Sequence, residues 1–158
     1  MGAYFPLFVD LSAREVLVVG AGHIASRRIE TLTSFTKNIT VIAPEASLAV
    51  QQLAQQGGIR LLVRPYIEGE IPKETYLVLA ATDSRNVNQA VYRECKDKGI
   101  LVNVCSDRKL CDFYFPGIVQ GEDLVVGVTA NGKDHRLARK LTEEIRKLTE
   151  GFSGGSCV

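Results

Sequence analysis

The chain has 158 residues, of which 46% are hydrophobic and 23% are charged, and its formal net charge is +1 at pH 7. This length allows one domain with a substantial core plus an extension and excludes two full-sized domains, while the composition excludes extensive disorder. The near-neutral charge provides no long-range attraction to a polyanion, so we expect no nucleic-acid partner.

The apolar runs and the cysteines indicate a cytoplasmic protein. No segment has the length and flanks of a signal peptide or a membrane span, because the longest early apolar run is interrupted by the glycines at 20–22. We therefore expect no membrane contact. The cysteines lack the paired short spacing of a structural zinc site, so we expect reduced thiols and no metal site. They are Cys95, Cys105, Cys111 and Cys157.

The first predicted element is an apolar strand, 16–19, that breaks into a Gly-x-Gly-x-x-Ala turn. Gly20 permits a tight turn from strand to helix, Gly22 lets the backbone approach a pyrophosphate, and small Ala25 lets the helix pack closely on the strand. The pattern indicates a dinucleotide-binding turn. The alternative is a glycine turn in an α/β protein that binds nothing.

A helix should begin near His23, with its free amide groups directed at the phosphates. His23 itself would either contact a phosphate or pack over the turn. The apolar and long side chains that follow recur at roughly helical spacing. They are Ile24, Arg28, Leu32 and Phe35.

Strands and helices then alternate along the chain, which predicts a parallel sheet with helices on both faces, a Rossmann-like α/β fold. Leu48 and Leu53 should point inward from the second helix. Gly57 and Gly99 should end the second and third helices. The predicted elements are strand 39–43, helix 47–56, strands 59–63 and 76–81, helix 85–98 and strand 100–104.

A different module is expected from residue 112 onward. Two apolar strands, 113–119 and 124–128, are joined by a hairpin signal, and Asp134 can cap a helix over 135–148. We therefore divide the chain into a nucleotide-binding domain (1–111), an extension (112–150) and a flexible tail (151–158). The last helix has an apolar stripe formed by Leu137, Leu141, Ile145 and Leu148.

The loops at the carboxyl ends of the strands should gather near Gly22, because ligands bind at that edge of a parallel sheet. Glu45, after the second strand, could grip the ribose hydroxyls, or it could be a solvated residue near a helix start. No Arg is present there to pair with a 2′-phosphate, so NAD is favoured over NADP. Thr82 and Asp83 could hydrogen-bond the nicotinamide or its ribose, and Asp83 or Ser84 should also cap the next helix.

Charged residues later in the chain suggest two further contacts. Asp107 and Asp112 flank a polar loop where a carboxylate could accept a proton. A basic cluster near the start of the last helix suits a ligand rich in carboxylates, although a solvated helix face is the alternative. The cluster is Lys133, Arg136, Arg139 and Lys140.

Several short motifs occur in an order and spacing that resemble one known family, precorrin-2 dehydrogenase, whose module also forms the front of multifunctional siroheme synthases. The resemblance covers nearly the whole chain. It rests on Phe5-Pro6-Leu7-Phe8, Val18-Val19-Gly20-Ala21-Gly22, Ala80-Ala81-Thr82-Asp83 followed by Asn88, Asn103-Val104, Cys111-Asp112-Phe113-Tyr114-Phe115-Pro116, and Leu137-Ala138-Arg139.

The resemblance implies NAD-dependent oxidation of precorrin-2 to sirohydrochlorin, a step of siroheme (tetrapyrrole) biosynthesis and in some organisms of cobalamin biosynthesis. It also implies a homodimer, to which the extension would contribute. The implied cofactor contacts are Gly20, Gly22, His23, Ile24, Pro44 and Glu45. The tetrapyrrole is expected in a cleft beside the cofactor, with contacts from Asn103, Lys133, Arg136 and Arg139.

One departure concerns the catalytic base. Members of the family usually carry an Asp just after Asn-Val-x, whereas Ser106 stands at that place here and Asp107 follows one residue later. We expect Asp107 to act as the base beside Ser106, because a neutral hydroxyl accepts protons poorly at neutral pH. The alternative is a module that binds NAD or the tetrapyrrole and has lost the base.

A second departure is length. Family members generally continue into further helical segments that cover the substrate, whereas this sequence ends at Val158, as a short natural form or a truncated one. We therefore expect dehydrogenation rather than metal chelation, which needs an enclosed site. An NAD-dependent enzyme for a small hydroxy acid is disfavoured, because no His and Arg pair falls in the ligand-facing loops.

Overall fold

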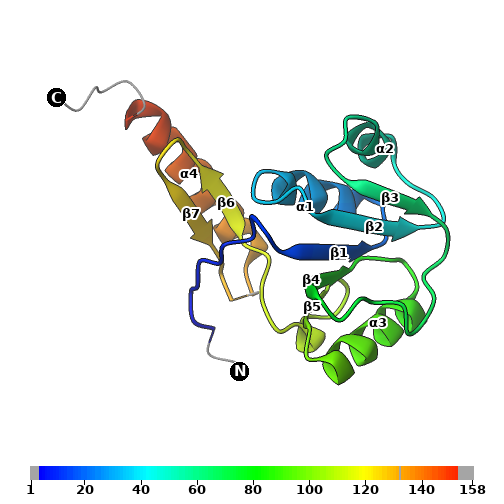
Figure 1. Ribbon diagram of the computed structural model, residues 1–158. Helices are drawn as coiled ribbons and strands as arrows, with labels where there is room; N and C mark the ends of the chain where they lie inside the picture. Colours follow the sequence, from blue (N-terminus) through cyan, green and yellow to red (C-terminus); the bar gives the residue numbers. More distant parts are fainter. Residues whose placement is uncertain (1–3, 132, 153–158) are drawn as a thin grey trace. The chain divides into compact units, whose positions relative to one another are not determined.

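The structure, a computed structural model, describes residues 4–131 and 133–152 (Figure 1). Two compact units follow one another along the chain and meet between Phe113 and Tyr114. The first unit contains a parallel sheet and its helices, and the second contains a hairpin and one long helix.

The first unit is built on a five-stranded parallel sheet with the strand order β3-β2-β1-β4-β5. The order reverses between β1 and β4, so the chain winds outward in both directions from the centre of the sheet. This arrangement, followed by the hairpin and helix of the second unit, confirms the predicted Rossmann-like fold class. The strands are β1 (Glu15–Val19), β2 (Ile39–Ala43), β3 (Arg60–Val63), β4 (Thr75–Ala80) and β5 (Leu101–Val104).

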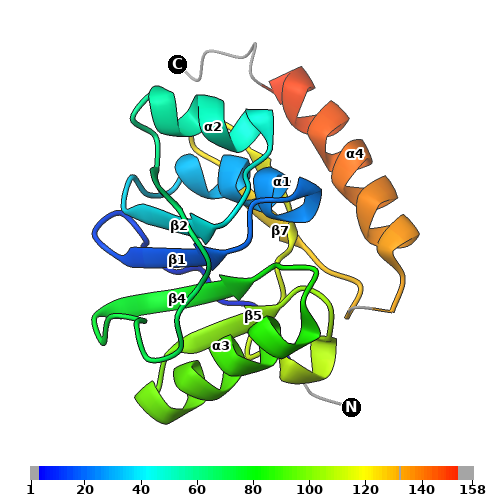
Figure 2. The ribbon, with the colours of Figure 1, turned by 90° about the vertical axis from the view of Figure 1, so that its right-hand side faces the viewer.

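Three helices flank this sheet: α1 (His23–Thr33), α2 (Leu48–Gln55) and α3 (Arg85–Lys98). The crossovers through α1 and α2 run one way along the sheet, and the crossover through α3 runs the other way. Because such crossovers are right-handed, α1 and α2 cover one face and α3 covers the opposite face. Figures 1 and 2 show α1 and α2 beside β2 and β3, and α3 beside β4 and β5.

The core of the first unit lies on both faces of the sheet. On one face, Val91 and Cys95 of α3 are fully buried in a cluster with Val78 and Val102 of the strands. On the other face, α1 buries three side chains, Ala25, Ile29 and Leu32. The almost uninterrupted apolar strands are explained by this burial on both sides.

One predicted inward residue is wrong, because Leu48 is 76% exposed. It lies in the first turn of α2, where the chain has just left the sheet edge, and the buried face of this helix falls two residues later, at Val50. The helix boundaries follow the predicted signals more closely: Ser84 caps α3, and Gly99 ends it in the left-handed conformation with φ 69°.

The second unit pairs β6 (Gly117–Gln120) with β7 (Val125–Val128) in an antiparallel hairpin, and α4 (His135–Phe152) lies along it (Figure 1). A Cβ built on Gly117 would lie 2.4 Å from the Thr142 hydroxyl oxygen of α4, so the missing side chain permits close packing of helix on hairpin. Asp134 caps α4 as predicted, accepting a hydrogen bond from the Leu137 amide at 2.9 Å. In the described part of the chain, no helix has both the length and the apolarity needed to cross a bilayer.

The predicted bounds of one strand and one helix in this unit need correction. The strand expected over 113–119 begins only at Gly117, directly after Pro116, because proline has no amide hydrogen to donate to a ladder. The helix expected to end at 148 continues to Phe152. It therefore includes the first two residues of the predicted flexible tail, and residues 153–158 of that tail lie outside the described residues.

The crossover from β3 to β4 contains no helix and is held on α3 by a buried carboxylate. Glu94 is 6% exposed. One of its oxygens accepts from the Tyr66 hydroxyl and from the Gly69 amide (2.8 Å), and the other accepts from the Ile71 amide (2.7 Å) and the Lys98 ammonium (2.5 Å). A buried charge with this many donors is fully compensated.

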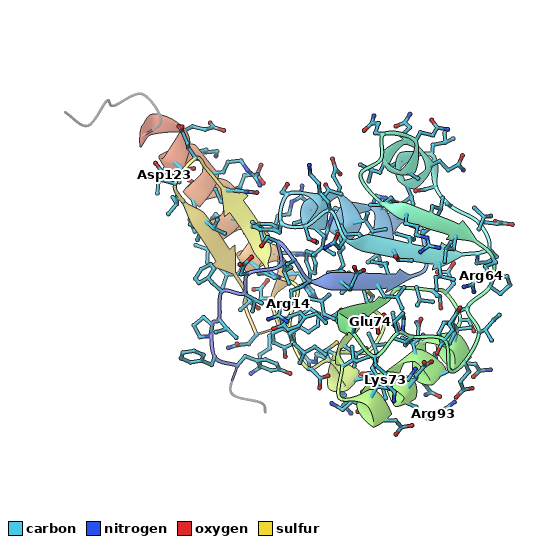
Figure 3. The ribbon with its side chains drawn as sticks, in the orientation of Figure 1. Arg14, Arg64, Lys73, Glu74, Arg93 and Asp123 are labelled. Carbon is cyan, nitrogen blue, oxygen red and sulfur yellow. The ribbon has the colours of Figure 1, made fainter. Side chains whose placement is uncertain are left out.

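A second ion pair shapes the same crossover. Arg64, labelled in Figure 3 at the end of β3, binds the Glu70 carboxylate through two nitrogens at 2.9 and 2.5 Å. The hydrogen bond from Arg64 lowers the pKa of Glu70, and a bond from the Ile67 amide acts in the same direction. The helix-free segment is thus held by polar contacts together with the buried Ile71 side chain, which belongs to the apolar core.

Replacing Glu94 by Gln should lower the free energy of unfolding by about 2 kcal/mol, because the amide nitrogen of Gln would face donors in place of an acceptor. The measurement is urea unfolding of both proteins at pH 7. Asp97→Asn removes one negative charge from the exposed side of the same helix and should change stability by less than about 0.5 kcal/mol. Equal effects of the two changes would contradict the assignment.

The same pair of variants should differ in acid. Burial alone would raise the pKa of Glu94, but hydrogen bonds from Lys98, Tyr66, Gly69 and Ile71 outweigh it and hold the pKa below the ordinary 4.5. Such a carboxylate stabilises the fold above its unfolded pKa, and this stability is lost as the pH falls through the folded pKa. Below pH 4.5 the wild type should therefore lose stability more steeply than Glu94→Gln.

Candidate functional site

The glycine turn after β1 is held between the two neighbouring strands. The Gly20 amide donates to the Ile42 carbonyl of β2, and the Ala81 amide after β4 donates to the Val19 carbonyl, both at 2.8 Å. Gly20 has φ 110°, and a Cβ built on it would lie 2.3 Å from the Ala81 carbonyl oxygen. The turn therefore requires glycine at this position for both its backbone conformation and its packing.

The first turn of α1 presents main-chain amides that no side chain caps. Gly22 is its N-cap residue, and the first turn contains no acidic side chain. The other three helices in the described part of the chain have side-chain caps, namely Ser47, Ser84 and Asp134. A Cβ built on Gly22 would have no atom within 4 Å. An open glycine before an uncapped helix N-terminus leaves room and free amides for a phosphate group, so these residues fit a pyrophosphate.

His23 and Ile24 open this helix, and both side chains are exposed. Since their backbone amides lie in the uncapped first turn, those amides are the groups that the fold directs toward an anion. Because both side chains are exposed, we expect their backbone amides, and not their side chains, to form the predicted contact with the cofactor.

The loop after β2 is fastened to the glycine turn. The Ser47 amide donates to the Ala21 carbonyl at 3.1 Å, and the Ser26 and Ser47 hydroxyl oxygens lie 2.6 Å apart. This places the predicted cofactor residues Pro44 and Glu45, both exposed, on a loop that contacts α1. Sequence reasoning missed the two serines, because a hydroxyl pair on two different helices has no signature in one sequence.

The side chain of Asn88, on α3, hydrogen-bonds the loop after β4. This residue is 2% exposed. Its Oδ1 accepts from the Thr82 amide (3.2 Å) and hydroxyl (2.7 Å), and its Nδ2 donates to the Thr82 carbonyl (3.0 Å) and to the Ser106 hydroxyl oxygen (3.2 Å). Two predicted residues, Thr82 and Ser106, are thus joined. The third, Asp83, is exposed on the same loop.

Asn103 lies in the middle of a buried contact between β5 and α1. It is 3% exposed. Its Oδ1 accepts from Arg28 at 2.5 Å, its Nδ2 donates to the Phe113 carbonyl at 2.8 Å, and the same Arg28 nitrogen lies 2.8 Å from the Cys105 sulfur. Both polar atoms of Asn103 are therefore engaged inside the fold, and its direct contact with a substrate stays a prediction.

Asp107 follows β5 and caps the short helix η1 (Arg108–Leu110) by accepting from the Lys109 amide at 2.9 Å. Its side chain is exposed. The other carboxylate of this loop, Asp112, is engaged on both oxygens, by Lys96 at 2.7 Å and by the Val102 amide at 3.0 Å. Both acids considered from the sequence are exposed residues, but Asp112 has both oxygens hydrogen-bonded, whereas within the described residues Asp107 accepts on Oδ1 alone.

The thiols of the first unit are poor nucleophiles. Burial raises the pKa of Cys95 to about 12, and burial also raises the pKa of Cys105 and of Cys111. All three are free, as predicted, and Cys157 lies outside the described residues. Among the described side chains, no three His, Cys, Asp or Glu residues gather closely enough to hold a metal ion.

The predicted basic residues lie in the second unit. Lys133 precedes α4, and Arg136 and Arg139 lie on its first turns, where all three side chains are exposed. Cations at a helix N-terminus are disfavoured by the helix dipole. These charges therefore do not stabilise α4, and their position suits an anionic ligand better than a structural role.

Comparisons with known proteins agree with this geometry. Residues 7–117 match a family described as "Putative NAD(P)-binding". The chain is 40% identical to the "Probable multifunctional siroheme biosynthesis protein HemA" of Ruminiclostridium josui, over 91% of this chain and 28% of that protein. It is 38% identical to siroheme synthase 1 of Serratia proteamaculans, over 96% of this chain and 32% of that protein. The chain thus spans about a third of the length of these curated relatives.

One solved structure is also similar to this chain. The precorrin-2 dehydrogenase SirC superposes with a TM-score of 0.80 and 26% sequence identity, and the match covers 92% of this chain and 70% of that one.

Replacing Gly20 by Ala should destabilise the protein by about 3 kcal/mol or more, since the new Cβ would collide with the Ala81 carbonyl in a backbone conformation that alanine avoids. The same replacement at Gly22, where a Cβ meets open space, should change the free energy of unfolding by less than about 0.5 kcal/mol. Urea unfolding of the two variants measures both values. Similar losses at the two positions would mean that the turn is not held as described.

Proposed function

This chain belongs to the NAD(P)-binding family that it shares with siroheme synthases, and on that premise we propose that it is an NAD-dependent precorrin-2 dehydrogenase that forms sirohydrochlorin. The observation that carries the proposal is the uncapped N-terminus of α1 beside the open Gly22. The likeness to SirC supports the choice of substrate. We propose the cytoplasm as the location of the enzyme.

The residues at the carboxyl edge of the sheet would hold the cofactor. Gly20, Gly22 and the amides of His23 and Ile24 would bind the pyrophosphate. Glu45 would accept hydrogen bonds from the ribose hydroxyls and would repel a 2′-phosphate, which favours NAD over NADP. When bound there, NAD supplies the hydride acceptor of the oxidation.

Two further features would contribute to cofactor binding. A shallow hollow of about 750 Å³ between α2 and β3 opens beside Glu45, and its apolar wall suits the flat face of the adenine. Thr82 and Asp83 follow the small residues at the end of β4, where the nicotinamide end could approach the backbone. Because Asn88 already uses the polar groups of Thr82, we assign the contact at this residue to the shape of the loop.

Asp107 would accept the proton that precorrin-2 loses when the hydride leaves. It is exposed, and the hydrogen bond from Lys109 fixes one carboxylate oxygen, so the group is oriented while its other oxygen stays open to a substrate. Ser106, the second residue assigned to the reaction, would act beside it as a hydroxyl donor, since a neutral hydroxyl is a poor base at neutral pH.

The substrate is a tetrapyrrole with many carboxylates, and Lys133, Arg136 and Arg139 would pair with them. For Asn103 we now propose a positioning role, because its polar atoms hold Arg28 and Phe113. The extension over 112–150 would also serve as the interface of a homodimer. Its helix α4 leaves an apolar stripe exposed, including Leu137, Leu141 and Leu148, and an apolar stripe of this kind is typically covered by a partner.

A second function remains in competition because Ser106 stands where the family carries its acid. In that case the chain would bind NAD or the tetrapyrrole without oxidising it. The two functions differ in turnover and agree in cofactor binding, so a combined measurement separates them.

Anaerobic incubation of the purified protein with enzymatically made precorrin-2 and NAD should produce NADH and the absorption spectrum of sirohydrochlorin together. Gly22→Ala is the matched control, since it should fold normally while its Cβ blocks the approach of the pyrophosphate. NAD binding without conversion by the wild type would favour the binding module. No NAD binding at all would contradict the cofactor assignment.

Asp107→Asn should reduce kcat at least about 100-fold, because general-base catalysis typically contributes that much, and should leave the NAD dissociation constant within about twofold. The amide oxygen of Asn can still cap η1, so the loop should keep its conformation. Steady-state kinetics and calorimetric titration measure the two quantities. Asp97→Asn, an exposed acid on α3, serves as the control, and an unchanged kcat in Asp107→Asn would exclude Asp107 as the base.

A further inference from the structure

Asn88 makes more polar contacts than a helix residue needs for stability. It lies near the start of α3, is 2% exposed, and uses its amide on two different loops. Three of its bonds hold Thr82 after β4, and the fourth holds Ser106 after β5. These loops are the two that flank the expected nicotinamide end of the cofactor.

The orientation of this amide is determined by its partners. Oδ1 faces two donors, the amide and the hydroxyl of Thr82, and Nδ2 faces the Thr82 carbonyl. A flipped amide would place its nitrogen against the Thr82 amide, two donors in contact. All four hydrogen-bonding positions of the side chain are therefore occupied, and Nδ2 must donate to Ser106 rather than accept from it.

This direction has a consequence for Ser106. Because its oxygen accepts from Asn88 at 3.2 Å, its hydroxyl proton is left to donate to another group. Ser106 is exposed, so that proton is available to a ligand. A carboxamide oxygen is an acceptor of the matching kind, and the nicotinamide carries one.

We propose that Asn88 is a positioning residue that joins Thr82 and Ser106 into one surface for the nicotinamide end of the cofactor and sets Ser106 as a hydrogen-bond donor to its carboxamide. This inference rests on the proposed use of NAD. It assigns the pyrophosphate and the nicotinamide to different residues, since the four side-chain hydrogen bonds of Asn88 go to Thr82 and Ser106 and not to the Gly20–Gly22 turn or Glu45.

The test compares NADH with ADP-ribose, which has the same pyrophosphate and riboses but no nicotinamide. Calorimetric titration of the full chain should show that the wild type binds NADH more tightly than ADP-ribose. Asn88→Asp keeps the shape and both accepting contacts but loses both donors. It should abolish the preference for NADH while the dissociation constant of ADP-ribose stays within about twofold. Ser106→Ala should lose about fivefold in NADH affinity, the worth of one hydrogen bond, and should have no further effect in the Asn88→Asp background.

The control is Asn86→Asp, the same substitution at an exposed position of α3, which should bind both ligands as the wild type does. A parallel loss of NADH and ADP-ribose affinity in Asn88→Asp would mean a merely structural residue, and an unchanged preference would also overturn the inference. Ser106→Ala carries the test if Asn88→Asp does not fold, because Ser106 lies at the surface: unchanged NADH affinity in this variant overturns the inference. A wild type that binds neither ligand refutes the proposed cofactor, and the inference with it.

Discussion

The close approach of the turn after β1 to the chain after β4 is the constraint on which the rest of this fold depends. A Cβ at Gly20 would lie 2.3 Å from the Ala81 carbonyl oxygen, so the two strands can end side by side only if residue 20 has no side chain. This contact lies where the strand order reverses, and it directs the uncapped end of α1 to the place where loops from both halves of the sheet meet. The arrangement of the strand ends at the ligand-facing edge therefore depends on glycine at position 20.

Partly buried polar contacts then fix the loops around that turn. Ser26 and Ser47 join α1 to the loop after β2, Arg28 joins α1 to β5, and Asn88 joins the loops after β4 and β5. Each bond adds only about 1 kcal/mol net, but losing one partner leaves the other unsatisfied where it is partly shielded from water. Such contacts select one arrangement of the loops more strongly than they stabilise the fold. The apolar core supplies the stability, and the polar side chains supply the geometry of the edge.

Most of the fold could be predicted from local patterns, because a buried strand, a glycine turn and a helix cap each leave a signature within a few residues. Gly20, Ser84, Gly99 and Asp134 all do in the structure what their residue types predict. The burial of side chains in the first turns of α1 and α2 could not be predicted, since it depends on where the chain leaves the sheet. Nor could the engagement of Asn103 by Arg28, because the two lie on elements far apart in the sequence. Which of the two acids has both oxygens engaged also depends on tertiary partners, as the ion pair of Asp112 with Lys96 shows.

The bare N-terminus of α1 also affects how the protein behaves when its edge is empty. Hydrogen bonds at the end of a helix open more readily when nothing caps them, so the first turn should fray more often than those of α2, α3 and α4. An anion binds to the form in which this first turn is helical, and binding shifts the equilibrium toward that form. The helix thus couples local order to occupancy: the segment that recognises the phosphate is also the one whose folding the phosphate completes. The turn expected to fray most readily thus lies at the ligand-facing edge, beside the close contact of Gly20 with Ala81.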